Sequence, residues 1–343
     1  PAFVKTLHEL CVDAVIVSDL GVIRTVQKHS RIPVHLSTQA SCLNVHAAKV
    51  WKQMGVERVV LGREVSLQEA VKIKKETGLE LEMFVHGSMC MAYSGNCVIS
   101  NYTQGRDSNR GGCAHSCRFQ YELDFSSMGL TQDEYQKRNA YFMSSKDLNG
   151  LRLLEDYIAA GIDSIKIEGR MKSHHYAGTI SRVYSEALKF YQQYGHFYSQ
   201  KMQEWEEELR KVSHRDYTQA SLKTPAGADS IYNEREKENR EYCVVGVVQE
   251  AVADKHLVIE VRSAFRPFDE LELVPFQGPS KIFTVKELER LNGRPVEKTK
   301  PGTLVKIPYV SPAEKWNLVR AKIQKTGPAE QHAKKGSEQH VQF

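Results

Sequence analysis

Residues 33–64 read PVHLSTQASCLNVHAAKVWKQMGVERVVLGRE, in which two runs of β-forming residues flank a helical pattern. Runs of the same kind occur at residues 14–19 (AVIVSD) and 81–87 (LEMFVHG). Their centres lie about 20 to 25 residues apart, a spacing that is typical of successive βα units. The runs are apolar almost throughout, as expected of parallel strands that are buried on both faces. This pattern predicts an α/β fold, and we expect a TIM-like (β/α) barrel.

Each of these four runs ends in polar residues. In (β/α) barrels the active site lies at the carboxyl ends of the strands, so four consecutive polar ends predict side chains that surround a pocket. The alternative is that these residues only cap helices and solvate loops. The polar residues at the four ends are Asp19, Ser37 with Gln39, Arg63 with Glu64, and His86. We assign Gln39, Arg63 and Glu64 to substrate binding and His86 to catalysis.

The chain is expected to contain two domains. Two more β-forming runs, at 141–149 and 164–170, give six predicted strands, which is too few for an eight-stranded barrel, so we expect the missing strands before Pro1. From residue 240 onward, short strands alternate with turn signals, as in a small antiparallel β-barrel. The predicted division is a barrel domain (1–222), a linker (223–239), a small β-barrel (240–322) and a disordered tail (323–343).

The composition is that of a soluble globular protein, because 41% of the 343 residues are apolar and 26% are charged. The net charge of +5 permits a polyanionic partner such as RNA without requiring one. We expect no signal peptide, and no apolar run approaches the roughly 20 residues of a membrane helix. The seven cysteines cannot all form disulfides, which favours a reducing, cytoplasmic location where clustered cysteines bind metal.

The stretch FVHGSMCMAYSGNCVISNYTQGRDSNRGGCAHSCRFQY (84–121) carries four of these cysteines in the pattern Cys-x6-Cys-x15-Cys-x3-Cys. Four thiolates can bind one tetrahedral Zn²⁺, or one iron each of a [4Fe–4S] cluster. Structural zinc sites usually have two short cysteine pairs, and only the second pair is short here. The spacing favours an iron–sulfur cluster over zinc, and buried free thiols are the third possibility. The candidate ligands are Cys90, Cys97, Cys113 and Cys117.

A second group of charged residues lies in SIKIEGRMKSHHY (164–176). Lys166, Glu168 and Arg170 alternate along the predicted strand, so they are expected on one face. There they would bind a charged ligand, with Arg170 suited to a carboxylate or phosphate, or form an internal network of ion pairs. We assign Glu168 and Arg170 to catalysis and Lys166 to substrate binding. No H-E-x-x-H or G-x-S-x-G hydrolase motif is present, and a Cys90–His86 pair would remove a thiolate from the metal site.

Several segments together resemble the collagenase-like peptidase family U-32, and within it the tRNA 5-hydroxyuridine modification proteins. They are HLSTQAS, RVVLGREVSL, the cysteine block from FVHGSMCMAYSGNC to GGCAHSCR, SSKDLNG through IKIEGRMKS, and HRDYTQA (214–220). The resemblance covers most of the chain, and the cysteine block is its most specific part. It implies a barrel with about three further strands ahead of this chain. It also implies a [4Fe–4S] cluster bound by Cys90, Cys97, Cys113 and Cys117.

The resemblance further implies prephenate-dependent hydroxylation of the wobble uridine in tRNA. Arg63, Lys166 and Arg170 would then bind prephenate through its carboxylates. The expected partners are tRNA and a second copy of the chain or a related protein, with no membrane. Two alternatives stay open, namely a peptidase of the U-32 type and a noncatalytic RNA-binding protein with structural zinc.

Overall fold

The computed structural model describes residues 1–94, 96–121, 143–227 and 239–323. The described residues form two compact units. The first contains residues 1–171 and 215–227, and the second contains residues 172–214 and 239–323. The predicted domain boundaries remain a prediction. In these described ranges, no helix is both long and apolar enough to cross a membrane.

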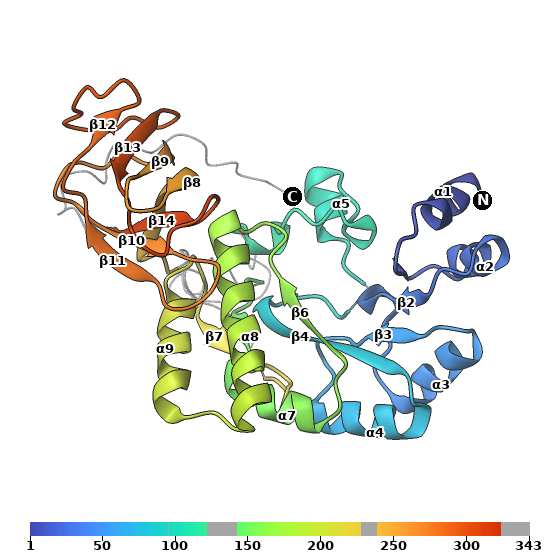
Figure 1. Ribbon diagram of the computed structural model, residues 1–343. Coiled ribbons are helices and arrows are strands. Elements are labelled where there is room, and N and C mark those ends of the chain that lie inside the picture. Colours follow the sequence, from blue (N-terminus) through green and yellow to red (C-terminus); the bar gives the residue numbers. More distant parts are fainter. Residues whose placement is uncertain (95, 122–142, 228–238, 324–343) are drawn as a thin grey trace, which may run out of the picture. The chain divides into compact units, whose positions relative to one another are not determined.

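The first unit is built on parallel strands that follow one another in βα order (Figure 1). The parallel strands are β1 (Val15–Val17), β2 (Val34–Leu36), β3 (Arg58–Val60), β4 (Glu80–Ser88) and β6 (Ser164–Glu168). The helices include α1 (Ala2–Glu9), α2 (Leu20–His29), α3 (Val45–Gln53), α4 (Leu67–Thr77) and α7 (Leu154–Ala159). The predicted α/β architecture is confirmed, whereas closure into a barrel remains a prediction.

Local sequence explains why helices start after β1, β2 and β3. The side chains of Asp19, Asn44 and Ser66 each accept a hydrogen bond from the backbone N–H three residues further along. These are N-caps, which satisfy donors that the first helical turn leaves without partners. Asp19 is therefore a helix cap, as the alternative interpretation of the strand ends stated.

Strand β5 (Asp147–Asn149) differs from the sequence prediction of a strand over 141–149. It is antiparallel to the end of β4 and parallel to β7 (Tyr217–Thr218). Residues 141 and 142 lie outside the described part. β3 pairs with β4 only over Glu80–Glu82, which leaves the later backbone groups on that side of β4 available to β5. Antiparallel pairing does not require the crossover connection that parallel strands need.

The second unit combines two helices with an antiparallel sheet, and its elements are α8 (His174–Tyr194), α9 (Ser199–Arg210), β8 (Tyr242–Val252), β9 (His256–Val261), β10 (Glu270–Val274), β11 (Lys281–Thr284), β12 (Glu289–Arg290), β13 (Leu304–Pro308) and β14 (Leu318–Lys322). The strand order is β11-β10-β14-β8-β9-β13-β12. Aliphatic residues such as Val248, Ile259 and Leu273 form its core. The predicted antiparallel sheet is confirmed, but its closure into a barrel remains a prediction.

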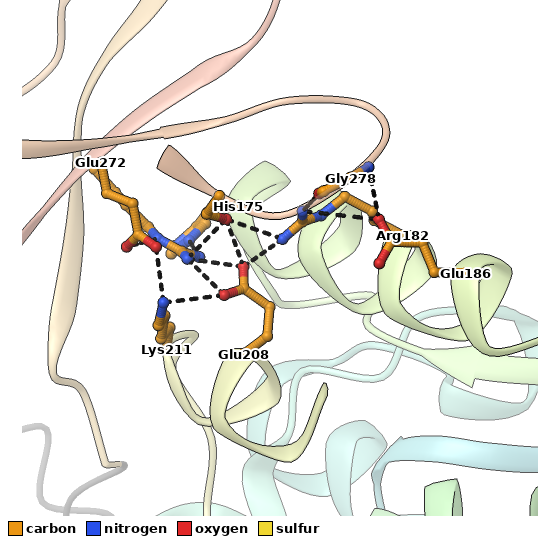
Figure 2. A network of polar contacts seen from close by, with 9 residues as sticks. His175, Arg182, Glu186, Glu208, Lys211, Glu272 and Gly278 are labelled. Carbon is orange, nitrogen blue, oxygen red and sulfur yellow. Dashed lines mark hydrogen bonds and ion pairs between the residues drawn. The ribbon is translucent and has the colours of Figure 1, made fainter. Parts of the chain in front are cut away.

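A buried network of ion pairs joins α8 and α9 to this sheet (Figure 2). Arg320 on β14 is 0% exposed. Its Nη2 lies 2.7 and 2.9 Å from the two carboxylate oxygens of Glu208, and its Nε lies 2.9 Å from Glu272. Lys211 bridges the same two carboxylates, at 3.1 Å from Glu208 and 2.7 Å from Glu272. Buried charges persist only when they are paired in this way, so the helices and the sheet form one body.

Candidate metal centre

The four candidate ligands lie in one loop, residues 89–121, which we call the cysteine loop. It begins where β4 ends and contains α5 (Ile99–Gln104) and two short 3-10 helices, η2 (Ser108–Arg110) and η3 (Ser116–Arg118). Because β4 runs parallel to β3 and β6, the loop starts at the carboxyl ends of the parallel strands. This is the edge at which barrel enzymes carry their active sites.

In the structure, each of the four cysteine side chains interacts with at least one of the others. The thiol of Cys90 forms a hydrogen bond with the sulfur of Cys97, and Cys117 interacts electrostatically with both Cys113 and Cys97. All four side chains are partly buried. Nowhere in the described ranges do three or more His, Cys, Asp or Glu side chains form a group that could hold a metal ion. The metal site therefore remains a prediction.

Cys97 lies in surroundings that favour its thiolate form. Its pKa is lowered from 9.0 to about 5, chiefly because the Cys90 thiol donates a hydrogen bond to it. The Ser108 hydroxyl and two backbone N–H groups, those of Ile99 and Ser100, add to this effect and outweigh burial. The pKa of Cys90 is raised, because its proton is held in the bond to Cys97 and because the thiol is buried. Burial also raises the pKa of Cys117, against the nearby charges of Arg118 and Arg215.

Polar residues at the strand ends hold the cysteine loop in place. The carboxylate of Glu64, after β3, accepts hydrogen bonds from the backbone N–H of Ser94 at 3.0 Å and from its hydroxyl at 2.7 Å. Gln39, after β2, donates from Nε2 to the carbonyl of Ser108 at 3.0 Å. Two of the predicted pocket residues are thus brought to the loop. Ser94 and Ser108 were not singled out from the sequence, because their role appears only once the loop is folded.

Arg63 connects the loop to β4 and β6. Its guanidinium carbon lies 3.8 Å from the centre of the Phe84 ring, and its Nη2 lies 3.5 Å from Glu168. Its positive charge acts to lower the pKa of Cys90, so the guanidinium lies near that sulfur. Arg63 thus pairs with Glu168 and also provides a positive charge near the cysteines.

Arg170 also lies against the cysteine loop. A Cβ built on Gly111 would come within 3.2 Å of Nη1 of Arg170, so the guanidinium packs over this glycine. The Arg170 side chain is exposed, and its backbone N–H donates to Glu168 at 3.1 Å. The structure thus gathers Arg63, Glu168 and Arg170 around the loop.

Two other predicted site residues, Lys166 and His86, make contacts with residues of the strands. The ammonium of Lys166 lies 3.0 Å from Glu82, which is the ion-pair alternative raised for this charged strand. His86 is only 1% exposed, and its ring packs edge-on against Tyr217 at 5.3 Å between centroids. An irregularity in the pairing of β4 with β6 places His86 opposite Ile167, which alternates along β6 with Lys166 and Glu168. Because alternate residues face opposite ways, His86 does not share a face with those charges.

The structure adds two arginines that sequence reasoning did not assign to the site. Arg118 donates from Nη1 to the carbonyl of Ser145 at 3.1 Å and from Nη2 to that of Met89 at 3.0 Å. Arg215 donates to the same Ser145 carbonyl at 3.2 Å and to the Ser144 hydroxyl. The available signals were the position of Arg118 directly after Cys117 and the segment HRDYTQA, which contains Arg215.

Comparison with protein-family models gives two matches. The model described as "Peptidase family U32" matches residues 1–231, and that described as "Peptidase family U32 C-terminal domain" matches residues 240–320.

Three curated relatives illustrate what the chain is similar to. It is 40% identical over 282 residues to "tRNA hydroxylation protein P1" of Bacillus subtilis, covering 81% of this chain and 65% of that protein. It is 32% identical over 336 residues to "tRNA hydroxylation protein P" of Escherichia coli, covering 84% of this chain and 72% of that protein. It is 36% identical over 185 residues to an E. coli 23S rRNA 5-hydroxycytidine synthase, covering 54% of this chain and 27% of that protein. The chain therefore spans about two thirds of the first relative's length.

Proposed function

Because the chain belongs to peptidase family U32, we propose that it is an RNA-modifying enzyme, and more narrowly one that converts the wobble uridine of tRNA to 5-hydroxyuridine. Two of the named relatives are tRNA hydroxylation proteins, and the third is named for a hydroxylated cytidine in rRNA. Hydroxylation of RNA is the activity that these names support for this chain.

The observation that carries the proposal is the arrangement of the four thiols of the cysteine loop at the strand ends. Cys90 is hydrogen-bonded to Cys97, and Cys117 interacts electrostatically with Cys97 and Cys113. We propose that Cys90, Cys97, Cys113 and Cys117 bind a [4Fe–4S] cluster. A bound cluster would supply one-electron redox chemistry at this edge of the sheet. Thiolate ligation makes such a cluster an anion, and three guanidinium groups, those of Arg63, Arg118 and Arg215, lie close enough to affect the cysteines.

The fit of the loop to a cluster has support beyond the four thiols. The Nε of Arg118 is buried and has no hydrogen-bond partner in the described residues. Buried N–H groups in native proteins nearly always have an acceptor. Cluster sulfides and ligating cysteine sulfurs are acceptors for such donors, which help to set the potential.

The residues around the loop would bind the small co-substrate. We propose that Arg170 binds a carboxylate of prephenate, because its guanidinium is exposed, lies over Gly111 and can form two parallel N–H···O bonds. Glu168 fixes the backbone of Arg170 and pairs with Arg63, so it orients both arginines. In this proposal Gln39 and Glu64 hold the loop, and Lys166 and His86 support the strands beneath it.

The function can be tested in a strain from which the endogenous tRNA-hydroxylating genes have been deleted. The chain is expressed there in three forms, namely unchanged, as Cys113→Ser and as Cys243→Ser, which alters a cysteine outside the loop. Mass spectrometry of tRNA nucleosides should show 5-hydroxyuridine derivatives with the unchanged chain and with Cys243→Ser but not with Cys113→Ser. If the unchanged chain restores nothing, or Cys113→Ser restores as much, the proposal is wrong.

The alternative is the proteolytic activity that the family's name states. It would need an activated nucleophile. The Cys90 thiol instead donates its hydrogen bond to Cys97, and His86 packs against Tyr217. Peptide cleavage by anaerobically purified chain that is unaffected in Cys113→Ser would favour the peptidase.

A further inference from the structure

Arg118 links the two ends of the cysteine loop through one side chain. It follows Cys117 directly, while the two carbonyls that it binds belong to Met89, which precedes Cys90, and to Ser145, just before β5. The Met89 carbonyl also accepts the Ser145 hydroxyl at 2.6 Å. One guanidinium therefore joins the backbone beside the first candidate ligand to the backbone beside the last.

The third donor of this guanidinium, Nε, has no acceptor in the part of the chain that the structure describes, although it is shielded from solvent. Leaving a buried donor without an acceptor is unfavourable, because the group has lost its hydrogen bonds to water and gained none in return. Arg118 follows Cys117 directly in the chain, and its Nη2 binds the carbonyl of Met89, which precedes Cys90, so the guanidinium lies between the first and last candidate ligands. An acceptor at or next to Cys117 would satisfy Nε without any change in the other two hydrogen bonds.

We infer that Arg118 is a positioning residue for the proposed cofactor, an inference that rests on the proposed function. Its Nε–H donates to the Cys117 sulfur or to an inorganic sulfide of the cluster bound there. Nη1 and Nη2 hold the guanidinium in the orientation that this requires. Nothing in the family descriptions or in the names of the relatives assigns such a role to this residue.

Arginine suits this position in a way that lysine does not. The planar guanidinium presents its donors at fixed angles, so two can bind carbonyls while the third points elsewhere. Lysine would keep the charge but not this arrangement. Arg215 binds the same Ser145 carbonyl at 3.2 Å, which brings a second positive charge beside Arg118. Two cations that converge on one carbonyl repel each other, and an anionic cluster next to them would reduce that repulsion.

The role has a measurable consequence for redox behaviour. A reduced cluster carries one more negative charge than an oxidised one, so a nearby N–H donor and cation stabilise the reduced form more strongly. Loss of the Nε–H donor should therefore shift the midpoint potential to a more negative value. A purely structural residue would leave the potential unchanged as long as the cluster is bound.

The test compares Arg118→Lys with Arg110→Lys, which alters an arginine of the same loop whose side chain is 88% exposed. Both variants and the unchanged chain are purified without air and loaded with iron and sulfide. Metal content is measured first, followed by a redox titration monitored by electron paramagnetic resonance. We expect Arg118→Lys to show a more negative midpoint potential and an altered spectrum, and Arg110→Lys to match the unchanged chain. An Arg118→Lys variant that loads fully with an unchanged potential and spectrum would overturn the inference.

Thermal unfolding of the metal-free proteins covers the case in which Arg118→Lys fails to load. If its metal-free form melts like the unchanged chain, lost loading supports a role toward the cluster. If its metal-free form is already unfolded, Arg118 serves only the fold and the inference is wrong. An unchanged chain that binds no iron would instead refute the proposed cofactor, so the two failures can be told apart.

Discussion

A single glycine, Gly112, limits how the cysteine loop can pack. A Cβ at this position would lie 2.5 Å from the carbonyl oxygen of Asp107, a backbone atom that cannot move aside on its own. The backbone N–H of Gly112 also donates to that carbonyl at 2.6 Å. Close approach of two backbone segments is a situation that requires glycine.

We therefore expect Gly112→Ala to displace the loop beside Cys113, to destabilise the first unit by about 1–3 kcal/mol and to reduce iron loading. Gly178→Ala is the matched control, because Gly178 lies inside α8 and an added Cβ would meet nothing within 4 Å. That change should stabilise the chain by up to about 1 kcal/mol. Denaturant unfolding and iron analysis of both variants measure the changes in stability and in iron loading. Equal changes in the two variants would contradict the proposed close packing at Gly112.

His175 makes the second unit sensitive to acid. Its Nε2 lies 3.2 Å from Nη1 of Arg320, which can only donate, so the imidazole must be neutral there. Burial first, and the charge of Arg320 second, lower the pKa of His175 from 6.5 to about 4. The unfolded chain therefore takes up this proton at a higher pH than the folded chain. The free energy of unfolding should decrease as the pH falls from 6.5 to about 4.

The predicted loss from His175 is about 3 kcal/mol across that pH window. Glu208, whose pKa is lowered to about 2, stays ionised throughout it. His175→Gln keeps an acceptor for Arg320 but cannot titrate, so its unfolding free energy should depend less on pH. Chemical denaturation of both proteins at several pH values measures the difference. Parallel pH profiles would show that His175 is not the group responsible.

At the level of elements, the turn after β3 holds the cysteine loop in place through the hydrogen bonds between Glu64 and Ser94. Glu64→Ala removes both hydrogen bonds to Ser94, and hydrogen bonds to charged groups contribute about 1.5–3 kcal/mol each. We expect faster proteolysis within the loop and less bound iron. Glu76→Ala is the control, because its carboxylate is exposed on α4 and pairs only with Lys49, at 2.5 Å, in the described contacts. Limited proteolysis mapped by mass spectrometry tests this. If the loop of Glu64→Ala resists cleavage as well as that of Glu76→Ala, Glu64 does not hold the loop in place.

The junction of α8 and α9 with the antiparallel sheet depends on Arg320. Replacing it with methionine leaves Glu208 and Glu272 buried near each other with only part of their countercharge. Removal of one partner from a buried ion pair costs about 3–5 kcal/mol. Lys201→Met, which breaks the exposed pair with Glu204, should change the stability little. Thermal unfolding of the two variants should differ clearly in midpoint, and similar midpoints would contradict a structural role for the network.

At the scale of the whole molecule, the sequence predicted the features that repeat along the chain. Strand runs and helical patterns at βα spacing located β1 to β4 and β6, since burial on both faces leaves continuous apolar runs. The antiparallel sheet followed from short runs and turns. The cysteine spacing pointed to the loop, and the structure links its four thiols.

The features that the sequence did not predict depend on contacts between distant residues. The bond from Ser94 to Glu64 spans 30 positions and that from Arg118 to Ser145 spans 27, and periodicity carries no information about such pairs. A strand was predicted over 141–149, but the three-residue length of β5 and its antiparallel pairing with β4 are set by its partners. An irregularity in strand pairing, which leaves no mark in the residue pattern, places His86 opposite Ile167, and its predicted catalytic role stays a prediction.

The account as a whole depends on what the four loop cysteines bind. The most direct measurement is the iron, sulfide and zinc content of chain purified without air, alongside Cys113→Ser and the control Cys243→Ser. We predict about four iron and four sulfide per chain for the unchanged protein and Cys243→Ser, with a large loss in Cys113→Ser. A preparation free of iron that holds about one zinc per chain would contradict the redox function and favour a structural site.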